Sequence, residues 1–516
     1  MIRTIEQRLK IPIWLVAFTI MIPTIASILG TSTVTVGVGH MAGAFGSTRD
    51  EVNWVVTSYM ITHAIMLPIS GWLENYFGRR NFLKLITVIF GVGSLICLMA
   101  TNLNTLIFGR IVQGIGGGPF MPLSQAILLQ VYPKEKHGIA MGIFSIAVMV
   151  SAIMGPAIGG YLVDNFCLQA LFIINIPISI FSVVLIHCNV MNNPARVKVK
   201  NPDIVGIISI VLWLFSMQVV LDKGQQYGWF DARWICWLSG FSLCAFMFFI
   251  VWELENKNPI TNVRAFTNLN LLIGTILASF LNVIAYATLV ALPMFLQSLM
   301  GYTAQLGGAS MIARSLACFV AILIVPKLTT ILDSRVLIGT GFLFLGISTL
   351  MMTNISLEYS FSCTILPNII FGFGLIMAFI PVSAMALSTL PKSSLSSAAG
   401  MHSLSKCVTT AITISMTNTL IARLSQAHQV YLVDNLTQFN NIFLYKLSML
   451  TSKFLHYSAD NIASIKANTV LYKQLLVQSK LMSFVDVFAI FALPAFLLIP
   501  CVFLLKNKKE EKNSVK

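Results

Sequence analysis

Long apolar runs constrain what this chain can fold into more than any other feature. Runs of about twenty apolar residues, long enough to cross a hydrocarbon core of roughly 30 Å as a helix, recur from one end to the other. Lipid offers no partner to unpaired backbone groups, and the runs are too long for the strands of a membrane barrel. Only 10% of the 516 residues are charged, compared with roughly 25% in soluble domains. The sequence therefore predicts an all-α integral membrane protein.

The apolar runs are interpreted as fourteen membrane spans, an even number that places both termini on one side. The spans cover residues 12–37, 52–70, 82–101, 105–131, 138–163, 169–189, 204–221, 233–252, 270–297, 306–326, 336–354, 361–387, 398–421 and 484–506.

The net charge of +15 is spread over short loops and is not gathered in one domain, so binding to nucleic acid is not predicted. Twenty-one Lys and Arg residues fall on loops that share a side with the N-terminus, and nine fall on the other side. The positive-inside rule then places both termini in the cytoplasm. The other three basic residues, Arg110, Arg314 and Lys406, lie inside spans, where a charge is costly and by default functional.

The nine cysteines lie within or at the edges of apolar runs and form no CxxC pair, so neither a disulfide framework nor a metal site is indicated. The first apolar run is too long for a signal peptide, and we expect it to be retained as a span.

The two halves of the chain resemble each other. RIVQGIGGGPFMPLS at 110–124 aligns with NIIFGFGLIMAFIPVS at 368–383, and YPK at 132–134 aligns with LPK at 390–392. Matching halves that both begin in the cytoplasm indicate parallel repeats about an axis along the membrane normal, as in the major facilitator fold. Two six-helix bundles account for twelve spans and leave the seventh and eighth as an inserted pair.

This organisation predicts six parts. They are an N-terminal six-helix bundle at 1–190, a cytoplasmic linker at 191–203, the inserted helices at 204–252, the first five helices of the C-terminal bundle at 253–421, a long periplasmic or extracellular loop with amphipathic stretches at 422–483, and the last helix with a basic tail at 484–516.

The segment GWLENYFGRR at 71–80 resembles the loop signature of major facilitator transporters through Gly71, Gly78, Arg79 and Arg80. Asn75 stands where the family usually has Asp, and Glu74 comes one place earlier. Glycines permit a tight turn, and the arginines are suited to hold a carboxylate or a helix C-terminus of the opposing bundle in one transport state. The plainer alternative is a basic cytoplasmic loop that only follows the topology rule.

Two further motifs point to the same family. Arg110, Gln113, Gly114 and Gly116 match its fourth-span pattern R-x-x-Q-G-x-G, in which the buried arginine is expected to face a cavity. SAIMGPAIGG at 151–160 resembles the antiporter motif of the fifth span, which accompanies export. Its matching residues are Gly155, Pro156, Gly159 and Gly160. The alternative for the second motif is ordinary close packing of small residues.

Motifs along the whole chain resemble the fourteen-span drug:proton antiporters of the EmrB/QacA type, and within that family they favour the EmrB-like members. Examples are NWVVTSY at 53–59, LDKGQQYGWF at 221–230 and LPMFLQSLMGYTAQLGG at 292–308. The resemblance implies multidrug efflux driven by a proton gradient, with no cofactor, from the inner membrane of a bacterium. It also implies partners beyond lipid and a small-molecule substrate, namely a periplasmic adaptor and an outer-membrane channel, with the 422–483 loop as the expected contact.

One departure from the family concerns the proton carrier. Gly30 stands where the family has an acid, and none of the eighteen acidic residues falls in the middle of a span. Glu253 is expected at the solvated membrane edge. His63 and His402 lie within spans and are candidate proton sites, because imidazole has an unperturbed pKa of about 6.5. The alternative for each histidine is a packing residue held by hydrogen bonds.

Three classes of function follow. The leading hypothesis is a proton-coupled exporter of neutral or anionic amphipathic molecules, and its narrower variant exports one endogenous metabolite. The second is a transport-impaired relative that acts as a membrane scaffold or sensor. An enzyme is not expected, because the loops are too short for a catalytic domain and neither GxxxxGK[ST] nor HExxH occurs.

Overall fold

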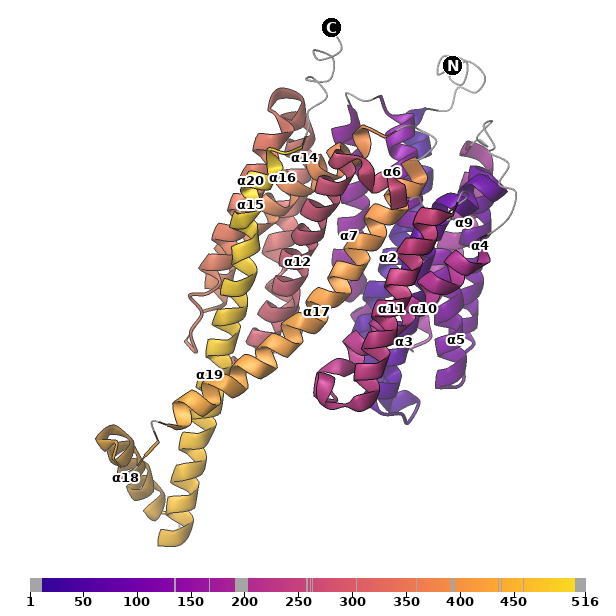
Figure 1. Cartoon of the computed structure of the whole chain (residues 1–516). Helices are drawn as coiled ribbons and strands as arrows, with labels where there is room; N and C mark the ends of the chain where they lie inside the picture. The colour runs from indigo at the N-terminus through magenta and orange to yellow at the C-terminus, as the bar shows by residue number, and fades with distance from the viewer. Residues whose placement is uncertain are drawn as a thin grey trace.

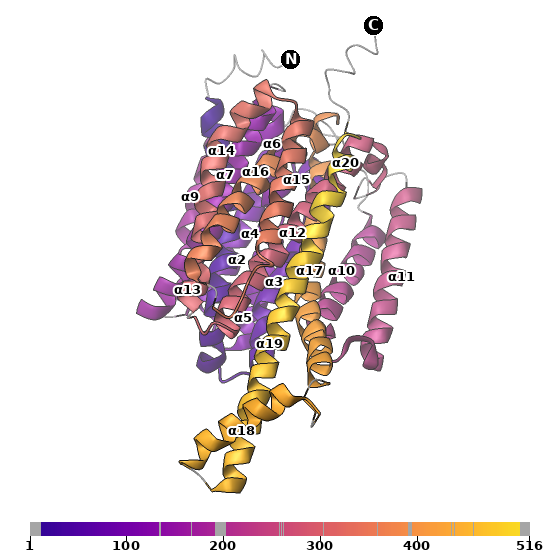
Figure 2. The same cartoon turned by 90° about the vertical axis from the view of Figure 1, so that its left-hand side faces the viewer.

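A computed structural model describes residues 12–505 apart from 134–135, 167, 191–202, 257–258, 260, 262, 303, 359, 391–394, 435, 438 and 458. In this part of the chain the secondary structure consists of helices alone, joined by short turns. Figures 1 and 2 show most of the helices running nearly parallel, with the start of α2 and the end helix α20 at the same end of the molecule. The all-α fold class is confirmed.

The N-terminal half forms one bundle. Its helices are α2 (Ile13–Ala44), α3 (Arg49–Phe77), α4 (Arg79–Leu98), α5 (Leu103–Gly117), α6 (Phe120–Val131), α7 (His137–Asn165), α8 (Ala170–Ile173) and α9 (Asn175–Asn189). A capping box of Thr48 and Glu51 starts α3, since each side chain satisfies a backbone N–H that has no helical partner. The expected fourth span is divided into α5 and α6 at Gly118 and Pro119.

The C-terminal half forms a second bundle. Its helices are α12 (Leu269–Ser298), α13 (Ala304–Ala309), α14 (Ile312–Ile331), α15 (Ser334–Met351), α16 (Ile365–Ser388), α17 (Leu395–Val433), α19 (Asp460–Leu497) and α20 (Ile499–Val502), with the short 3₁₀ helices η3 (Val263–Thr267) and η4 (Phe361–Thr364).

The inserted pair is α10 (Ile204–Gly224) and α11 (Arg233–Glu255), joined by η2 (Trp229–Asp231). These two helices pack on each other and reach the body through α3 and α17, and both figures place them at its side. Asp203 caps α10 by accepting a hydrogen bond from the backbone N–H of Gly206 at 2.9 Å. Several large apolar side chains of the pair are exposed, among them Ile208, Phe241 and Met247, and lipid is the natural surrounding of such a surface.

The segment 422–483 is mostly helical. The last part of α17, the separate helix α18 (Asn441–Leu455) and the first part of α19 extend beyond the body (Figures 1 and 2). The helices α17 and α19 therefore continue from the expected spans without a break, and α18 packs against α19. His428 of α17 and Asp486 of α19 are joined by a contact of 2.6 Å between Nε2 and Oδ2 where this extension begins.

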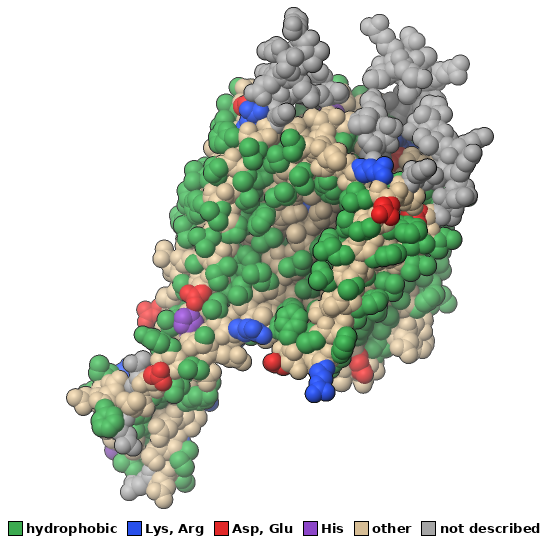
Figure 3. All heavy atoms as spheres, in the orientation of Figure 1, with side chains coloured by type: hydrophobic (Ala, Val, Ile, Leu, Met, Phe, Trp, Pro, Cys, Tyr) green, Lys and Arg blue, Asp and Glu red, His purple; other side chains and the backbone are tan. Residues whose placement is uncertain are grey.

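Eleven helical segments among the described residues are long and apolar enough to cross a membrane. The three remaining expected spans correspond to the broken pair α5 and α6, to α7 and to α17. Figure 3 shows hydrophobic side chains over the sides of the body and charged side chains mainly toward its two ends. This distribution agrees with fourteen spans.

The buried hydrophobic clusters differ between the two ends of the molecule. The largest cluster joins α2, α4, α6 and α7 of the first bundle to α14, α16 and α17 of the second. Of the other clusters, one lies only in the N-terminal half, with Val34 and Val55 among its members, and one lies only in the C-terminal half, with Ala287 and Phe484. We call the end at which one core joins both halves the closed end.

The closed end carries the close approaches between the halves. A Cβ atom on Gly142 of α7 would lie 2.8 Å from the Pro326 ring of α14, and one on Gly400 of α17 would lie 2.6 Å from the Leu67 carbonyl of α3. Glycine is needed at these positions because any larger residue would push the helices apart.

Candidate transport site

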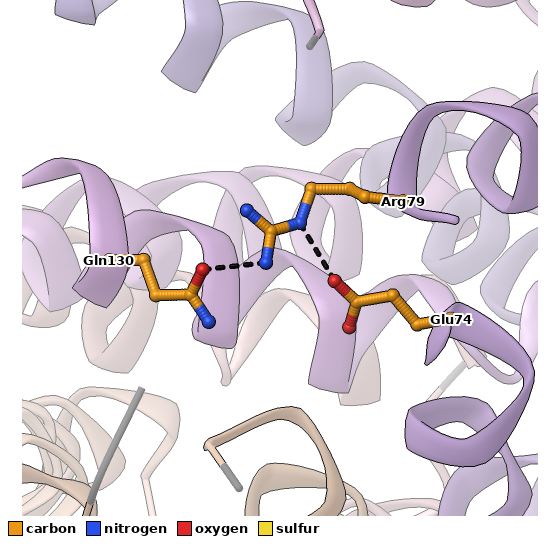
Figure 4. Close-up of polar contacts among 3 residues, drawn as sticks. All are labelled: Glu74, Arg79 and Gln130. Carbon is orange, nitrogen blue, oxygen red and sulfur yellow. Dashed lines mark hydrogen bonds and ion pairs between the residues drawn. The ribbon is translucent and has the colours of Figure 1, made fainter. Parts of the chain in front are cut away.

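The signature turn, residues 71–80, joins α3 to α4 at the closed end. Gly78 ends α3 with φ of 81° and ψ of 144°, a conformation that essentially only glycine adopts without strain. The turn brings Arg79 back onto Glu74, whose carboxylate accepts from Nε at 2.7 Å. The same guanidinium donates from Nη2 to Gln130 Oε1 of α6 at 2.6 Å, and Figure 4 shows both contacts. Glu74, displaced by one place from the family acid, thus supplies the acidic partner of Arg79.

Arg80 points to another helix of the same half. Its Nη2 donates to the backbone carbonyl of His187 near the end of α9, where a cation is favoured by the helix dipole. Lys84 of α4 approaches the His187 ring, with 2.7 Å between Nζ and Nδ1. These contacts of the two signature arginines lie inside the N-terminal bundle. Gly71 lies buried in the last turns of α3.

Arg110 is fully buried. Its Nε donates to the Val55 carbonyl at 3.0 Å, and its Nη1 donates to the Gly30 carbonyl at 3.3 Å and to Gln113 Oε1 at 2.5 Å. The guanidinium also stacks over the Tyr59 ring, 4.2 Å from the centroid. These contacts tie α5 to α2 and α3 through one side chain.

Gln113 extends this network to α4, because its Nε2 donates to Ser94 Oγ at 2.8 Å. Gly114 and Gly116 let α5 approach its neighbours: a Cβ on Gly116 would lie 2.5 Å from the Phe90 backbone nitrogen. The fourth-span motif therefore works as a packing and hydrogen-bonding unit in this structure.

Arg314 occupies a related position in the second half. Its Nε donates to Asn368 Oδ1 at 2.9 Å, its Nη1 donates to Thr288 Oγ1 at 3.1 Å, and it stacks over the Phe371 ring at 3.9 Å. Asn368 is the residue that aligns with Arg110 in the internal repeat. The two halves thus each bury one guanidinium over an aromatic ring, but the second arginine comes from α14, a neighbour of the repeat-equivalent helix α16.

His402 and Lys406 lie one turn apart in α17. His402 is fully buried, with 3.0 Å between its Nδ1 and Thr275 Oγ1 of α12, while its Nε2 has no hydrogen-bond partner. Lys406 is 7% exposed, and its Nζ lies 5.6 Å from the centre of the Phe379 ring. The structure therefore brings together an unsatisfied imidazole nitrogen and a buried ammonium group.

His63 is half-buried in α3. Its ring lies 5.6 Å from the Tyr59 ring, tilted by 34°. Tyr59 also stacks on Arg110, so His63 belongs to the surroundings of the first buried arginine.

The antiporter motif lies in α7, where it faces α2. A Cβ on Gly155 would lie 2.3 Å from Ser32 Cβ, and one on Gly159 would lie 2.8 Å from the Thr33 carbonyl. The two helices are in extensive contact, as expected for small residues that permit close packing. Pro156 and Gly160 belong to the same helix, and nothing further is described for them.

Glu253 corrects one expectation, because it is fully buried and not solvated. Its Oε2 accepts from the Thr261 backbone N–H at 3.2 Å, and Oε1 has no hydrogen-bond partner. A Cβ on Gly206 would lie 2.8 Å from both this oxygen and Asp203 Oδ2. The fold of α10 onto α11 produces this pair of carboxyl groups, which are distant in sequence.

Several partners of the candidate residues were not singled out from the sequence. They are uncharged residues that contact an arginine, Gln113 or His402: Tyr59, Ser94, Gln130, Thr275, Thr288, Asn368 and Phe371. The internal repeat offered a signal for Asn368, since it aligns with Arg110. Phe371 aligns with Gln113 in the same repeat, and Tyr59 ends the motif NWVVTSY.

Comparisons with known proteins agree with these observations. Residues 20–414 match the family model described as Major Facilitator Superfamily. The chain is 30% identical over 418 residues to the multidrug export protein EmrB of Escherichia coli strain K12, covering 81% of this chain and 82% of that protein. It is 27% identical over 480 residues to the fatty acid resistance protein FarB of Neisseria gonorrhoeae, covering 93% of each.

Solved structures share the fold at lower identity. The human organic anion transporter MFSD10 aligns with a TM-score of 0.61 at 11% identity, over 96% of this chain and all of that one. The proton:xylose symporter XylE aligns with a TM-score of 0.60 at 13% identity, over 94% of each chain.

Proposed function

Because the chain belongs to the Major Facilitator Superfamily, we propose that it exports small amphipathic molecules from the cytoplasm in exchange for protons. The 30% identity to a multidrug export protein supports efflux of several compounds. The two bundles move against each other in this proposal, so that a central site opens alternately to the two sides of the membrane. The chain is a multi-pass membrane protein, and we place it in the cytoplasmic membrane of a bacterium with both termini in the cytoplasm.

The observation that carries this proposal is the unequal contact between the halves. One hydrophobic core joins both halves at the closed end, whereas the clusters that contain Val34 and Ala287 each stay within one half. A protein that alternates between two openings needs an interface that is packed at one end at a time. With the termini in the cytoplasm, this arrangement corresponds to a state closed toward the cytoplasm.

His402 is the first candidate for the proton site. It is buried between Thr275 of α12 and the turn that carries Lys406, and one ring nitrogen remains unsatisfied. Protonation of His402 would place a positive charge close to Lys406. Helix movement that separates the two side chains, or admits water between them, would therefore raise the proton affinity of His402. His63 is the second candidate, next to Tyr59 and the Arg110 site.

The buried charges favour neutral or anionic substrates. Arg110, Arg314 and Lys406 are each less than a tenth exposed, and they contact carbonyls, amides, hydroxyls and aromatic rings. A cationic substrate near these groups would meet repulsion that no neighbouring carboxylate offsets.

The extension formed by α18 and the adjoining parts of α17 and α19 is the proposed contact for a periplasmic adaptor that leads to an outer-membrane channel. Large apolar side chains stand exposed there, including Phe439 at 94% and Tyr457 at 85%. Isolated apolar residues are normal on a surface, but a contiguous set outside the membrane is typical of a binding site for another protein.

Transport by purified protein in lipid vesicles tests the proposal. We expect a fluorescent amphipathic acid to move against its gradient when a pH gradient is imposed and to stop when an ionophore dissipates it. His402→Gln should lose the pH dependence, while His456→Gln, an exposed histidine on the extension, serves as the matched control. Substrate movement that is indifferent to the pH gradient would contradict proton exchange.

The second candidate function is a membrane scaffold or sensor that has lost transport. Gly30 in place of the family acid favours it, because that acid is the usual proton carrier. Vesicles that bind substrate but move none under any gradient would favour this candidate.

A further inference from the structure

Two buried hydrogen-bond donors near Gly30 lack an acceptor. Arg110 Nη2 and Asn175 Nδ2 make no hydrogen bond, and the two side chains are 0% and 1% exposed. Both belong to the surroundings of Gly30: Arg110 Nη1 donates to the Gly30 carbonyl at 3.3 Å, and a Cβ on Gly30 would lie 3.1 Å from Asn175 Nδ2. The donors come from α5 and α9 and converge on one position of α2.

Among the described residues, the buried guanidinium also forms no ion pair with a carboxylate. Arg110 donates hydrogen bonds to the carbonyls of Val55 and Gly30 and to the side-chain amide of Gln113. Buried polar groups are satisfied in the great majority of cases, and a buried cation without a compensating anion is strongly destabilising. Three neutral acceptors leave the charge of Arg110 uncompensated.

The position of Gly30 admits a further small group only if the Asn175 side chain shifts by a few tenths of an ångström. The neighbours that a Cβ would meet are Asn175 Nδ2 at 3.1 Å and Phe90 Cζ at 3.6 Å. The first contact requires a small adjustment by a terminal amide, and the second is an ordinary van der Waals distance. A small group that accepts hydrogen bonds is therefore compatible with this space.

We propose that the position beside Gly30 binds a small anionic group, which accepts hydrogen bonds from Arg110 and Asn175 and neutralises the buried guanidinium. The group is either a free monovalent anion such as chloride or the carboxylate of a bound molecule. We call this position the Gly30 anion site. Binding here requires no transport, so the site stands independently of the proposed exporter function.

Thermal unfolding of the purified full-length protein in detergent tests the site. Chloride is titrated against gluconate at constant ionic strength, so that the two series differ only in the anion. We expect the unfolding midpoint of the unchanged protein to rise with chloride, because a ligand that binds only the native state stabilises it. Gly30→Asp should raise the midpoint in gluconate and abolish the response to chloride, because the new carboxylate occupies the site.

Two variants separate charge from shape. Gly30→Asn adds nearly the same volume without a charge, so it should block the response to chloride without the stabilisation that Gly30→Asp brings. Asn175→Ala keeps Arg110 and Gly30 and should weaken the response by about tenfold or more, as expected for the loss of a hydrogen bond to a charged group.

The source of the anionic group is distinguished with octanoate and octanamide. The site binds the carboxylate of a ligand if octanoate raises the unfolding midpoint, octanamide does not, and chloride weakens the effect of octanoate. Stabilisation by chloride alone assigns it to a free ion.

An unchanged protein that responds to neither chloride nor octanoate overturns the proposal. It is also overturned if Gly30→Asp responds to chloride as strongly as the unchanged protein, because the anion then binds elsewhere, for example near Arg314 or Lys406. A protein that transports substrate in vesicles but shows either result retains its proposed function and loses only this site.

Discussion

At the scale of single residues, the candidate site is organised by side chains that satisfy buried charges. Arg79 is held by Glu74 and Gln130, and Arg110 and Arg314 each use carbonyl, amide or hydroxyl acceptors and an aromatic face. Arginine suits these roles because its five donors have a fixed planar arrangement and its face stacks on rings. The cations therefore position helices as well as setting the charge near the transport route.

Gly78 gives a prediction at this scale. Its positive φ places it where other residues are strained by roughly 1–3 kcal/mol, so Gly78→Ala should lower the midpoint of thermal unfolding and displace Arg79 from Glu74. Gly240→Ala is the matched control, because Gly240 lies in α11 with no atom within 4 Å of the added Cβ. Alanine there should stabilise the helix by about 0.5–1 kcal/mol. Equal effects of the two substitutions would contradict the role given to Gly78.

At the scale of helices, the extension beyond the membrane is built by continuing α17 and α19 past their spans. The separate helix α18 has no buried residue, so it contributes little to the core of the transporter. The contact between His428 and Asp486 lies nearer the body. It joins α17 to α19 directly and does not involve α18.

The extension can be tested by replacing Asn441–Leu455 with a flexible Gly-Ser linker. Transport in vesicles should stay unchanged, because no core residue is removed, while drug resistance conferred on two-membrane bacteria should fall if the extension contacts an adaptor. The contrasting control replaces residues 233–255 with a Gly-Ser linker of equal length. Because α11 is one of the apolar spans, this change should abolish transport in vesicles. Loss of vesicle transport on removal of α18 would show that the helix belongs to the transport unit itself.

At the scale of the whole molecule, the two bundles are joined by a large core at the closed end and by a smaller cluster that links α3 to α17 and the inserted pair. The repeat relates their helices: α5 packs against α4 and α3, and its counterpart α16 packs against α15 and α14. Movement between two openings would require the contact between α7 and α14 to separate while each bundle keeps its own packing.

A disulfide across the closed end tests this movement. A Cβ on Gly138 would lie 3.5 Å from Thr329 Cβ, at the lower limit of the usual range of about 3.5–4.5 Å for disulfides. In a variant without the nine native cysteines, Gly138→Cys with Thr329→Cys should stop transport when oxidised and recover it on reduction. Each single cysteine variant should transport under both conditions. Full transport by the oxidised pair would show that the closed end does not open.

The fold class and the approximate spans were predictable from sequence, because the membrane imposes a length and an apolar composition on each spanning helix. The internal repeat likewise indicated two related bundles, since G-x-G and F-x-P-x-S recur half a chain apart. The turn at Gly78 was also predictable from sequence, because a backbone with positive φ favours glycine whatever its tertiary surroundings.

Only the tertiary structure decided which groups meet. The sequence marked Arg79, Arg110 and His402, but the contacts of these residues with Gln130, Gly30 and Thr275 join different helices. The burial of Glu253 was likewise beyond reach of its local sequence. Local composition determines that a helix spans the membrane, whereas its rotation and its neighbours follow from packing the whole bundle. For this protein, the sequence determined that Gly30 lacks an acid, and the structure decided that two unsatisfied donors surround the position where that acid would be.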